Sequence, residues 1–303
     1  MDGIINVYKE KGYTSHDVVA IVRKLAGRPK CGHTGTLDPD AEGVLPLCLG
    51  KATKISQYIM DGYKRYEAVL KLGVTTTTED ASGEVLEERL VKAGLEDIKN
   101  VVNSFVGEYM QTPPMYSAIK VNGRKLYELA RKGEEIERKK RKVFIYSIDI
   151  LEYNFPDSCL LDVKCSKGTY IRTLCADIGK ALGCGGHMAS LLRTETSGFR
   201  LADSIKIDEL RRLAEEDRLS ETIIPMERFF ESWKKAYVKP EAEKILVNGG
   251  RIYEDFFETE YPLEYGEKLI AYFGEDNKTA GIYEYGFDAE KSADMLIPVK
   301  ILL

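Results

Sequence analysis

The chain lacks long apolar runs: no stretch approaches the about 18 consecutive apolar residues that a membrane-spanning helix needs. Its first residues, Met1 to Ile4, do not have the basic start and apolar segment of a secretory signal. We therefore expect a cytoplasmic protein with no membrane partner. The sequence also shows no internal repeat and no low-complexity linker, which excludes a repeat array.

Paired cysteines and clustered histidines are also missing. The six cysteines form no CxxC pair and follow no regular framework, and apolar neighbours surround several of them. This pattern predicts reduced, packed thiols in a cytosolic protein. The only histidines, His16, His33 and His187, include no pair four residues apart, which argues against a zinc site. We expect neither a metal nor another cofactor.

The net charge of −5 disfavours a nucleic-acid partner at first sight, but the charge is unevenly distributed. Residues 201–303 carry a net −9, whereas residues 1–200 carry +4. Within residues 117–142, ten Lys and Arg against four Glu give a local +6. Because salt screens charges beyond about 8 to 10 Å, such a patch can neutralise phosphates whatever the total charge. From charge alone, a solvated helix face and loop is the simpler explanation.

The hydrophobic periodicity predicts a chain that mixes strands and helices. Strands are expected at residues 3–8, 44–49, 63–73, 116–121, 143–153, 160–165, 188–192, 236–238, 268–273, 279–285 and 295–302. Helices are expected at residues 15–25 (capped by Ser15), 53–60, 95–105, 125–132, 170–182 and 241–246, and a loop at 75–83. Because hairpins alternate with helices set apart from them, the pattern favours an α+β fold over a doubly wound parallel sheet.

One loop, residues 32–46, is dense in Gly, Thr and Pro and contains both His33 and Asp38. Gly and Pro fix unusual backbone angles, so Asp38 is expected on a rigid turn. A carboxylate held in this way suits a nucleophile or a general base. An Asp in such a loop also commonly caps the turn through its own backbone, and the loop alone favours that explanation.

Eight short motifs occur in order along the chain: KEKGYTS (9–15), GHTGTLDPDAEGVLP (32–46), YKRYEA (63–68), PPMYSA (113–118), KVNG (120–123), YELARKG (127–133), KGTYIRTL (167–174) and HMASLLRT (187–194). The ordered set resembles the bacterial tRNA pseudouridine synthase B (TruB) family, whose members isomerise the T-loop uridine at tRNA position 55. The first motif departs from the family in having Glu10 where a proline is usual.

The resemblance implies a pseudouridine synthase core, with a mixed, mainly antiparallel sheet and flanking helices, at residues 1–230. A basic insert at about residues 110–142 would grip RNA, and residues 231–303 would form a small PUA-like β-barrel. The barrel rests mostly on the segment from Leu246 to Gly250. The implied activity is isomerisation of uridine 55 in the T loop by a monomer. It needs no cofactor, and its partner is the T-arm stem-loop of tRNA.

The family pattern also implies roles for individual residues. A stacked base is out of reach of a side chain, so the uridine must be flipped into a pocket. Asp38 would be the nucleophile, attacking either C6 of the ring or C1′ of the sugar, and the sequence does not separate the two routes. Arg172 would pair with Asp38, which should lower the pKa of that carboxyl. Without the motif, Arg172 would be taken for an ordinary surface arginine.

Tyr66 would stack on the uracil and take part in proton transfer, although a strand tyrosine is also commonly a core aromatic. The remaining implied contacts are the pocket walls Tyr170 and Leu191, His33 filling the gap left in the RNA, and phosphate contacts from Lys120, Arg124, Lys125, Arg131 and Lys132. Two alternatives stay open: a non-catalytic protein that binds or folds tRNA, and a pseudouridine synthase with another RNA substrate.

Overall fold

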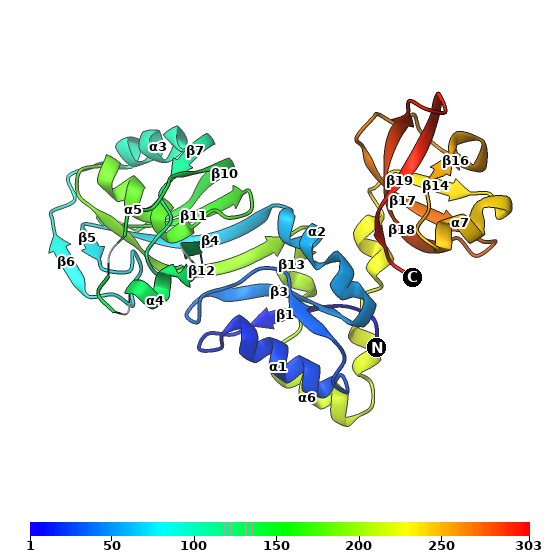
Figure 1. Cartoon of the computed structure of the whole chain (residues 1–303). Helices are drawn as coiled ribbons and strands as arrows, with labels where there is room; N and C mark the ends of the chain where they lie inside the picture. Colours follow the sequence, from blue (N-terminus) through cyan, green and yellow to red (C-terminus); the bar gives the residue numbers. More distant parts are fainter. Residues whose placement is uncertain (118, 122, 131, 135, 155) are drawn as a thin grey trace.

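The computed structural model describes residues 1–117, 119–121, 123–130, 132–134, 136–154 and 156–303. In this part of the chain, a nine-stranded sheet forms the body of the protein (Figure 1). Its strands are β1 (Gly3–Lys9), β2 (Cys31–His33), β3 (Glu42–Leu49), β4 (Lys64–Leu72), β7 (Gly107–Gln111), β10 (Arg141–Asn154), β11 (Ser158–Cys165), β12 (Gly186–Thr196) and β13 (Phe199–Arg200).

The main path through this sheet is β1-β3-β12-β4-β11-β10-β7, with β2 on β3 and β13 on β12. Among the described residues of this sheet, the short pairing of β12 with β3 is the one parallel strand pairing. The expectation of a mainly antiparallel α+β fold is therefore confirmed. The strand order places β12 and β4 in the middle of the sheet, where neighbours on both sides hold them.

Helices cover the two ends of the sheet separately. At one end, α1 (Ser15–Leu25) and α6 (Ile207–Glu215) bury their apolar faces against β1 and β3. At the other end, α3 (Leu95–Ser104) and α5 (Ile171–Ala181) pack on β4, β10, β11 and β12 (Figure 1). Alternate residues of each strand face the same side, so each helix pair completes one apolar layer.

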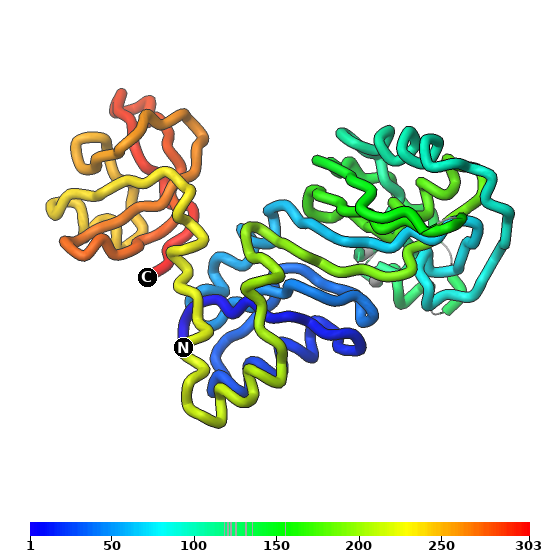
Figure 2. The backbone as a smooth tube through the Cα atoms, turned by 180° about the vertical axis from the view of Figure 1, so that it is seen from behind, coloured from blue at the N-terminus to red at the C-terminus, as the bar shows by residue number. Residues whose placement is uncertain are grey.

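A second, six-stranded sheet lies apart from the first, as the view from behind in Figure 2 also shows. Its order is β15 (Ile252–Tyr253), β19 (Ala293–Ile301), β18 (Lys278–Asp288), β17 (Lys268–Phe273), β14 (Lys235–Val238) and β16 (Phe257–Thr259). In the described residues its two edge strands do not pair, so this sheet is an open one. The closed barrel that we expected is not seen.

The two sheets share an apolar cluster. Ile4 and Cys48 of the first sheet and Ile270, Ile282 and Leu302 of the second region are almost fully buried in it.

The smaller elements are α2 (Ser56–Asp61), α4 (Leu126–Ala130), α7 (Glu243–Val247), the hairpins β5 (Val74–Thr76) with β6 (Val85–Glu88) and β8 (Lys120–Val121) with β9 (Arg124–Lys125), and 3-10 helices at 50–55, 201–203, 219–222, 226–230, 240–242 and 254–256.

Several local expectations need correction. The helix at 15–25 is confirmed, but its N-cap is Thr14, whose side chain accepts from the Asp17 amide, and not Ser15. The predicted loop at 75–83 is the turn region of the β5–β6 hairpin. The strand expected at 188–192 extends over 186–196, because the polar residues at its end pair within the sheet.

All six cysteines are free, and five of them are buried, as the sequence predicts. No helix in the described part of the chain is long and apolar enough to cross a bilayer.

Candidate active site

The loop that contains Asp38 is fixed on both sides of that residue. Ahead of it, the buried Ser15 hydroxyl accepts from the Leu37 amide at 2.9 Å and donates to the Leu37 carbonyl at 3.1 Å. Behind it, the buried Lys9 ammonium donates to the carbonyls of Pro39 at 3.0 Å and Ala41 at 2.6 Å. Side chains from two different elements therefore hold the turn, which makes it a rigid support for a reacting group.

Arg172 reaches this loop from the second position of α5, and only 5% of the residue is exposed. Its Nη2 lies 3.1 Å from a carboxylate oxygen of Asp38 and donates to the Tyr116 carbonyl at 2.8 Å. Its Nη1 lies 3.5 Å from Asp80 and donates to the Thr78 carbonyl at 3.3 Å. One guanidinium thus joins the Asp38 loop, the turn of the β5–β6 hairpin and the start of the basic insert.

The pKa of Asp38 differs from the sequence-based expectation. Burial raises the pKa of this carboxyl, and Arg172 opposes the rise, while Asp80 adds to it. We expected Arg172 to lower the pKa, but its effect is smaller than that of burial. The Asp38 side chain is still 44% exposed, so water reaches the carboxylate and weakens both effects. A ligand that covered the loop would strengthen both.

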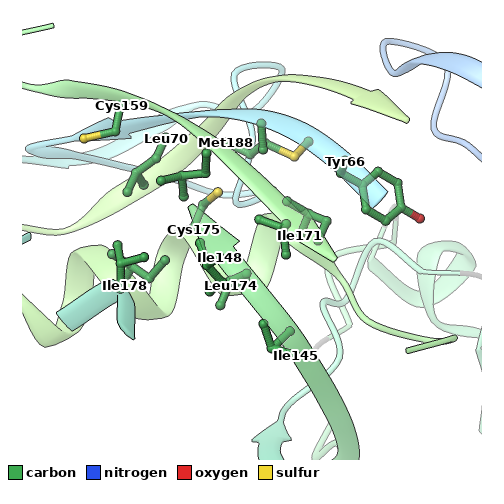
Figure 3. Close-up of a cluster of buried hydrophobic side chains, with 14 of the residues drawn as sticks. Tyr66, Leu70, Ile145, Ile148, Cys159, Ile171, Leu174, Cys175, Ile178 and Met188 are labelled. Carbon is green, nitrogen blue, oxygen red and sulfur yellow. The ribbon is translucent and has the colours of Figure 1, made fainter. Parts of the chain in front are cut away.

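Tyr66 lies on β4 and is 8% exposed, within a core cluster that includes Ile171 and Leu37. Figure 3 shows its ring at the edge of this cluster, with the hydroxyl pointing away from the labelled apolar side chains. Burial raises the pKa of the phenol, and the charge and hydrogen bond of Arg193 oppose that rise. The ring of Tyr66 is therefore part of the core, and its stacking on the uracil stays a prediction.

Tyr170 directly precedes α5, and the Gln111 side chain bonds to its backbone amide and carbonyl at 2.8 and 2.9 Å. Burial raises the pKa of the Tyr170 phenol, and the charge of Asp38 contributes to the rise. Leu191, on β12, is half-buried against the core cluster that contains Tyr66. Tyr170 is therefore within electrostatic range of Asp38, and Leu191 packs against the same core cluster as Tyr66; their role as pocket walls stays a prediction.

His33 ends β2, and its Nδ1 accepts a hydrogen bond from the Gly35 amide at 3.3 Å. Its ring lies edge-on to that of His16, with centroids 5.2 Å apart. Sequence reasoning did not bring these two histidines together, because 16 residues lie between them. Burial lowers the pKa of His33, with further contributions from His16 and Arg193. No group of three or more His, Cys, Asp or Glu in the described ranges could hold a metal ion.

The expected phosphate contacts lie in the insert, next to the site. Arg124 and Lys132 are exposed, whereas for Lys120 and Lys125 only the backbone, in the β8–β9 hairpin, is described. Arg131 lies outside the described residues. The insert is tied to the site through the Tyr116 carbonyl, which accepts from Arg172. It is anchored by buried Leu126 and Leu129, so it does not consist of solvated charge alone.

Sequence reasoning missed two charged residues of the site. Asp80 lies in the turn that was assigned to a threonine-rich loop, and its carboxylate accepts from Thr78 and Ser82. An acid flanked by Thr78 and Ser82 was a sequence signal that could have marked Asp80 as a candidate site residue. Arg193 is 1% exposed and bonds to the Asp38 loop, although it lies far along the chain on β12. It lies within one of the motifs, but nothing in the local pattern predicts its burial.

Solved structures with the same fold support an enzymatic interpretation. The chain aligns with one from a crystal structure of a Cbf5-Nop10-Gar1 complex at a TM-score of 0.76 and 27% identity, covering 99% of this chain and 85% of the other. A chain from an H/ACA RNP bound to a substrate RNA containing 2′-deoxyuridine aligns with a TM-score of 0.75 and 25% identity, with the same coverage. The architecture is that of the pseudouridine synthase fold.

Sequence comparison narrows this class. Residues 23–171 match the N-terminal domain of the TruB family of pseudouridylate synthases, and residues 172–231 match the tRNA pseudouridylate synthase B C-terminal domain. A tRNA pseudouridine synthase B of Alkaliphilus oremlandii is 50% identical over 93% of both chains, and that of Lachnoclostridium phytofermentans is 50% identical over the full length of both. The chain belongs to the TruB family.

Its activity is therefore the isomerisation of uridine to pseudouridine in tRNA. A relative from Staphylococcus saprophyticus with the same name, 44% identical over 93% of this chain and 94% of its own length, agrees with this assignment. The alternative of a non-catalytic protein that only binds or folds tRNA is set aside.

Proposed function

We propose that the enzyme modifies the uridine at position 55 in the T loop of tRNA, with Asp38 as the nucleophile. The observation that supports this most is the pairing of Asp38 with the buried Arg172, on a turn that Lys9 and Ser15 hold in place. Tyr66 and Tyr170 lie within electrostatic range of the same carboxylate. A fixed, paired acid between aromatic rings suits attack on a flipped pyrimidine.

The reaction exchanges the bond between C1′ and N1 of the uracil for a bond between C1′ and C5, and one proton moves from C5 to N1. Attack at C6 of the ring and attack at C1′ of the sugar both require an ionised Asp38. Arg172 would favour that form as the RNA excludes water. Tyr66 would stack on the uracil and handle the proton, Tyr170 and Leu191 would enclose the base, and His33 would fill its place in the loop.

We further propose that residues 1–230 form the catalytic domain and residues 231–303 a PUA-like RNA-binding domain, in a monomer of the cytoplasm. The free thiols agree with a reducing compartment. In this proposal, exposed Arg124 and Lys132, together with Lys120, Lys125 and Arg131, hold phosphates of the T arm. Because the segment 201–303 has a net charge of −9, most of the attraction to RNA should come from the insert.

The test compares Asp38→Asn with Asp40→Asn, which removes an exposed carboxylate two residues away. Each protein is incubated with an unmodified tRNA transcript, and the nucleosides are mapped by mass. We expect Asp38→Asn to abolish pseudouridine formation while tRNA binding persists, and Asp40→Asn to retain both. A transcript with cytidine at position 55 should acquire no pseudouridine. Pseudouridine made by folded Asp38→Asn would remove Asp38 from the role of nucleophile.

The likeness to chains of H/ACA particles favours a second candidate, action on another RNA with the help of a guide. The same assay separates the two, because it contains only purified protein and transcript. Modification of the free tRNA transcript without any guide supports the first proposal. If the free transcript stays unmodified and another RNA is modified only when a guide RNA pairs with it, the second is correct.

A further inference from the structure

Arg193 is the bulkiest of the almost fully buried side chains in the described residues, and it is 1% exposed. Among the described residues, Arg193 takes part in no ion pair, so no carboxylate of this set neutralises its guanidinium directly. A buried charge is costly unless other groups satisfy it. The groups that do so are therefore informative about why the arginine is there.

Two of these groups are backbone carbonyls of the Asp38 loop. The Nε of Arg193 donates to the Val44 carbonyl at 2.7 Å, and its Nη2 donates to the Gly35 carbonyl at 3.1 Å. These carbonyls flank the turn that includes Asp38, one before it and one after it. The planar fork of a guanidinium can hold both at once, whereas an ammonium is a point donor. Arg193 therefore closes the base of the loop.

The third group belongs to β4. In the sheet, Arg193 on β12 is opposite Gly43 of β3 on one side and Tyr66 of β4 on the other. Directly opposite residues have their side chains on the same face, so the guanidinium and the Tyr66 ring lie on the same side of the sheet. A hydrogen bond from Arg193 to Tyr66 and the charge of Arg193 both lower the pKa of that phenol. Arg193 therefore connects the strand of Tyr66 with the loop of Asp38.

We propose that Arg193 is a positioning residue of the isomerisation, which holds the Asp38 loop against Tyr66 and directs the Tyr66 hydroxyl toward the flipped uracil. The inference rests on the proposed roles of Asp38 and Tyr66. A guanidinium has donors only, so the phenol oxygen accepts at that contact and its own hydrogen must point elsewhere. When the Tyr66 hydroxyl gives its proton to N1, the adjacent positive charge stabilises the resulting phenolate until it takes up the proton that leaves C5.

The main test uses two variants. Arg193→Lys removes the guanidinium fork but keeps the positive charge, and Arg193→Gln removes the charge as well. The control is Arg211→Lys on α6, whose exposed guanidinium pairs with surface Asp208. We expect kcat on a tRNA transcript to fall about 100-fold in Arg193→Lys, as for a misplaced reacting group, and further in Arg193→Gln. KM and tRNA affinity of Arg193→Lys should match the control, and the variant should stay folded at the assay temperature although its melting temperature is lower.

An unchanged kcat in Arg193→Lys overturns the proposal. So does a loss of kcat that follows a parallel loss of tRNA binding or of folded protein at the assay temperature, because a purely structural residue would behave in that way. The result is separable from the proposed function: an active Asp38→Asn enzyme would refute the nucleophile, whatever the Arg193 variants do.

If neither Arg193 variant folds, the contact can be tested with Arg193 intact. Arginine side-chain ¹⁵N spectra of the wild type and Tyr66→Phe should then be compared, with Tyr63→Phe as the control on the neighbouring residue before β4. We expect the Arg193 guanidinium resonance to move only in Tyr66→Phe. An Arg193 resonance that stays in place would overturn the proposed link between the two residues.

Discussion

Replacing Arg172 by Met or by Lys separates the charge of this residue from its geometry. At 3.1 Å, the attraction to Asp38 is about 5 kcal/mol for an effective dielectric constant of about 20 and about 1 kcal/mol in bulk water. Because the Asp38 side chain is 44% exposed, we take about 2 kcal/mol for the pair. Losing that amount in Arg172→Met should slow the chemical step about 30-fold at neutral pH.

The expected loss in Arg172→Met depends on pH. Arg172 lowers the pKa of Asp38, so its removal raises that pKa and leaves less carboxylate as the pH falls. The deficit relative to wild type should therefore grow toward acidic pH and shrink toward alkaline pH. Lys at position 172 keeps the charge but cannot also serve Asp80 and the Tyr116 carbonyl. Arg172→Lys should lose less rate than Arg172→Met and show a weaker pH dependence.

The assay is single-turnover formation of pseudouridine in a tRNA transcript, measured across pH with enzyme in excess over RNA. The control is Arg218→Lys, since that exposed arginine pairs with Glu216 and Glu221 at the surface. Wild-type rates in folded Arg172→Met at every pH would refute the reasoning. A pH-independent loss of rate would show that the charge of Arg172 does not act on Asp38.

Three further predictions concern the loop that holds Asp38. Ser15→Ala leaves the Leu37 amide and carbonyl without their partner, so the free energy of unfolding should fall by about 1 to 3 kcal/mol in chemical denaturation, and an unchanged value would refute the role of Ser15. Burial lowers the pKa of Lys9 to about 8 from 10.5. The unfolded chain thus binds more protons between these values, and wild-type stability should rise across that range relative to Lys9→Met. Gly43 has φ +107°, and an added Cβ would lie 2.2 Å from the Arg193 carbonyl oxygen. Gly43→Ala should therefore lower the melting temperature sharply. The control Gly198→Ala, where an added Cβ has space, should lower it less.

Much of the fold follows from local patterns. The helix at 15–25 has the expected bounds, and β10 and β11 pair as antiparallel neighbours. Both segments show clear periodicity and are bounded by turn residues. The end of β12 was missed because its polar residues resemble a loop. In the sheet they pair with β3 and β4, and that pairing depends on strand order, which local periodicity does not encode.

The candidate site shows the same division. The resemblance of the motifs predicted that one site contains Asp38, Arg172, Tyr66 and Tyr170. The roles of these residues stay predictions. Burial of a charged side chain is a property of the complete fold, so neither the pairing of Arg172 with Asp80 nor the packing of Arg193 could be foreseen. The direction of the Asp38 pKa shift depends on the same packing, because desolvation there outweighs the neighbouring cation.

The apolar cluster shared by the two sheets has a consequence for the position of the target nucleotide in a long RNA substrate. Ile4 of the first sheet and Ile270 of the second are both fully buried in it, so relative motion of the two lobes would expose both side chains to water. The two sheets are therefore held at a fixed distance from each other. Any RNA helix that touches both must present its target nucleotide at a set number of base pairs from its other point of contact.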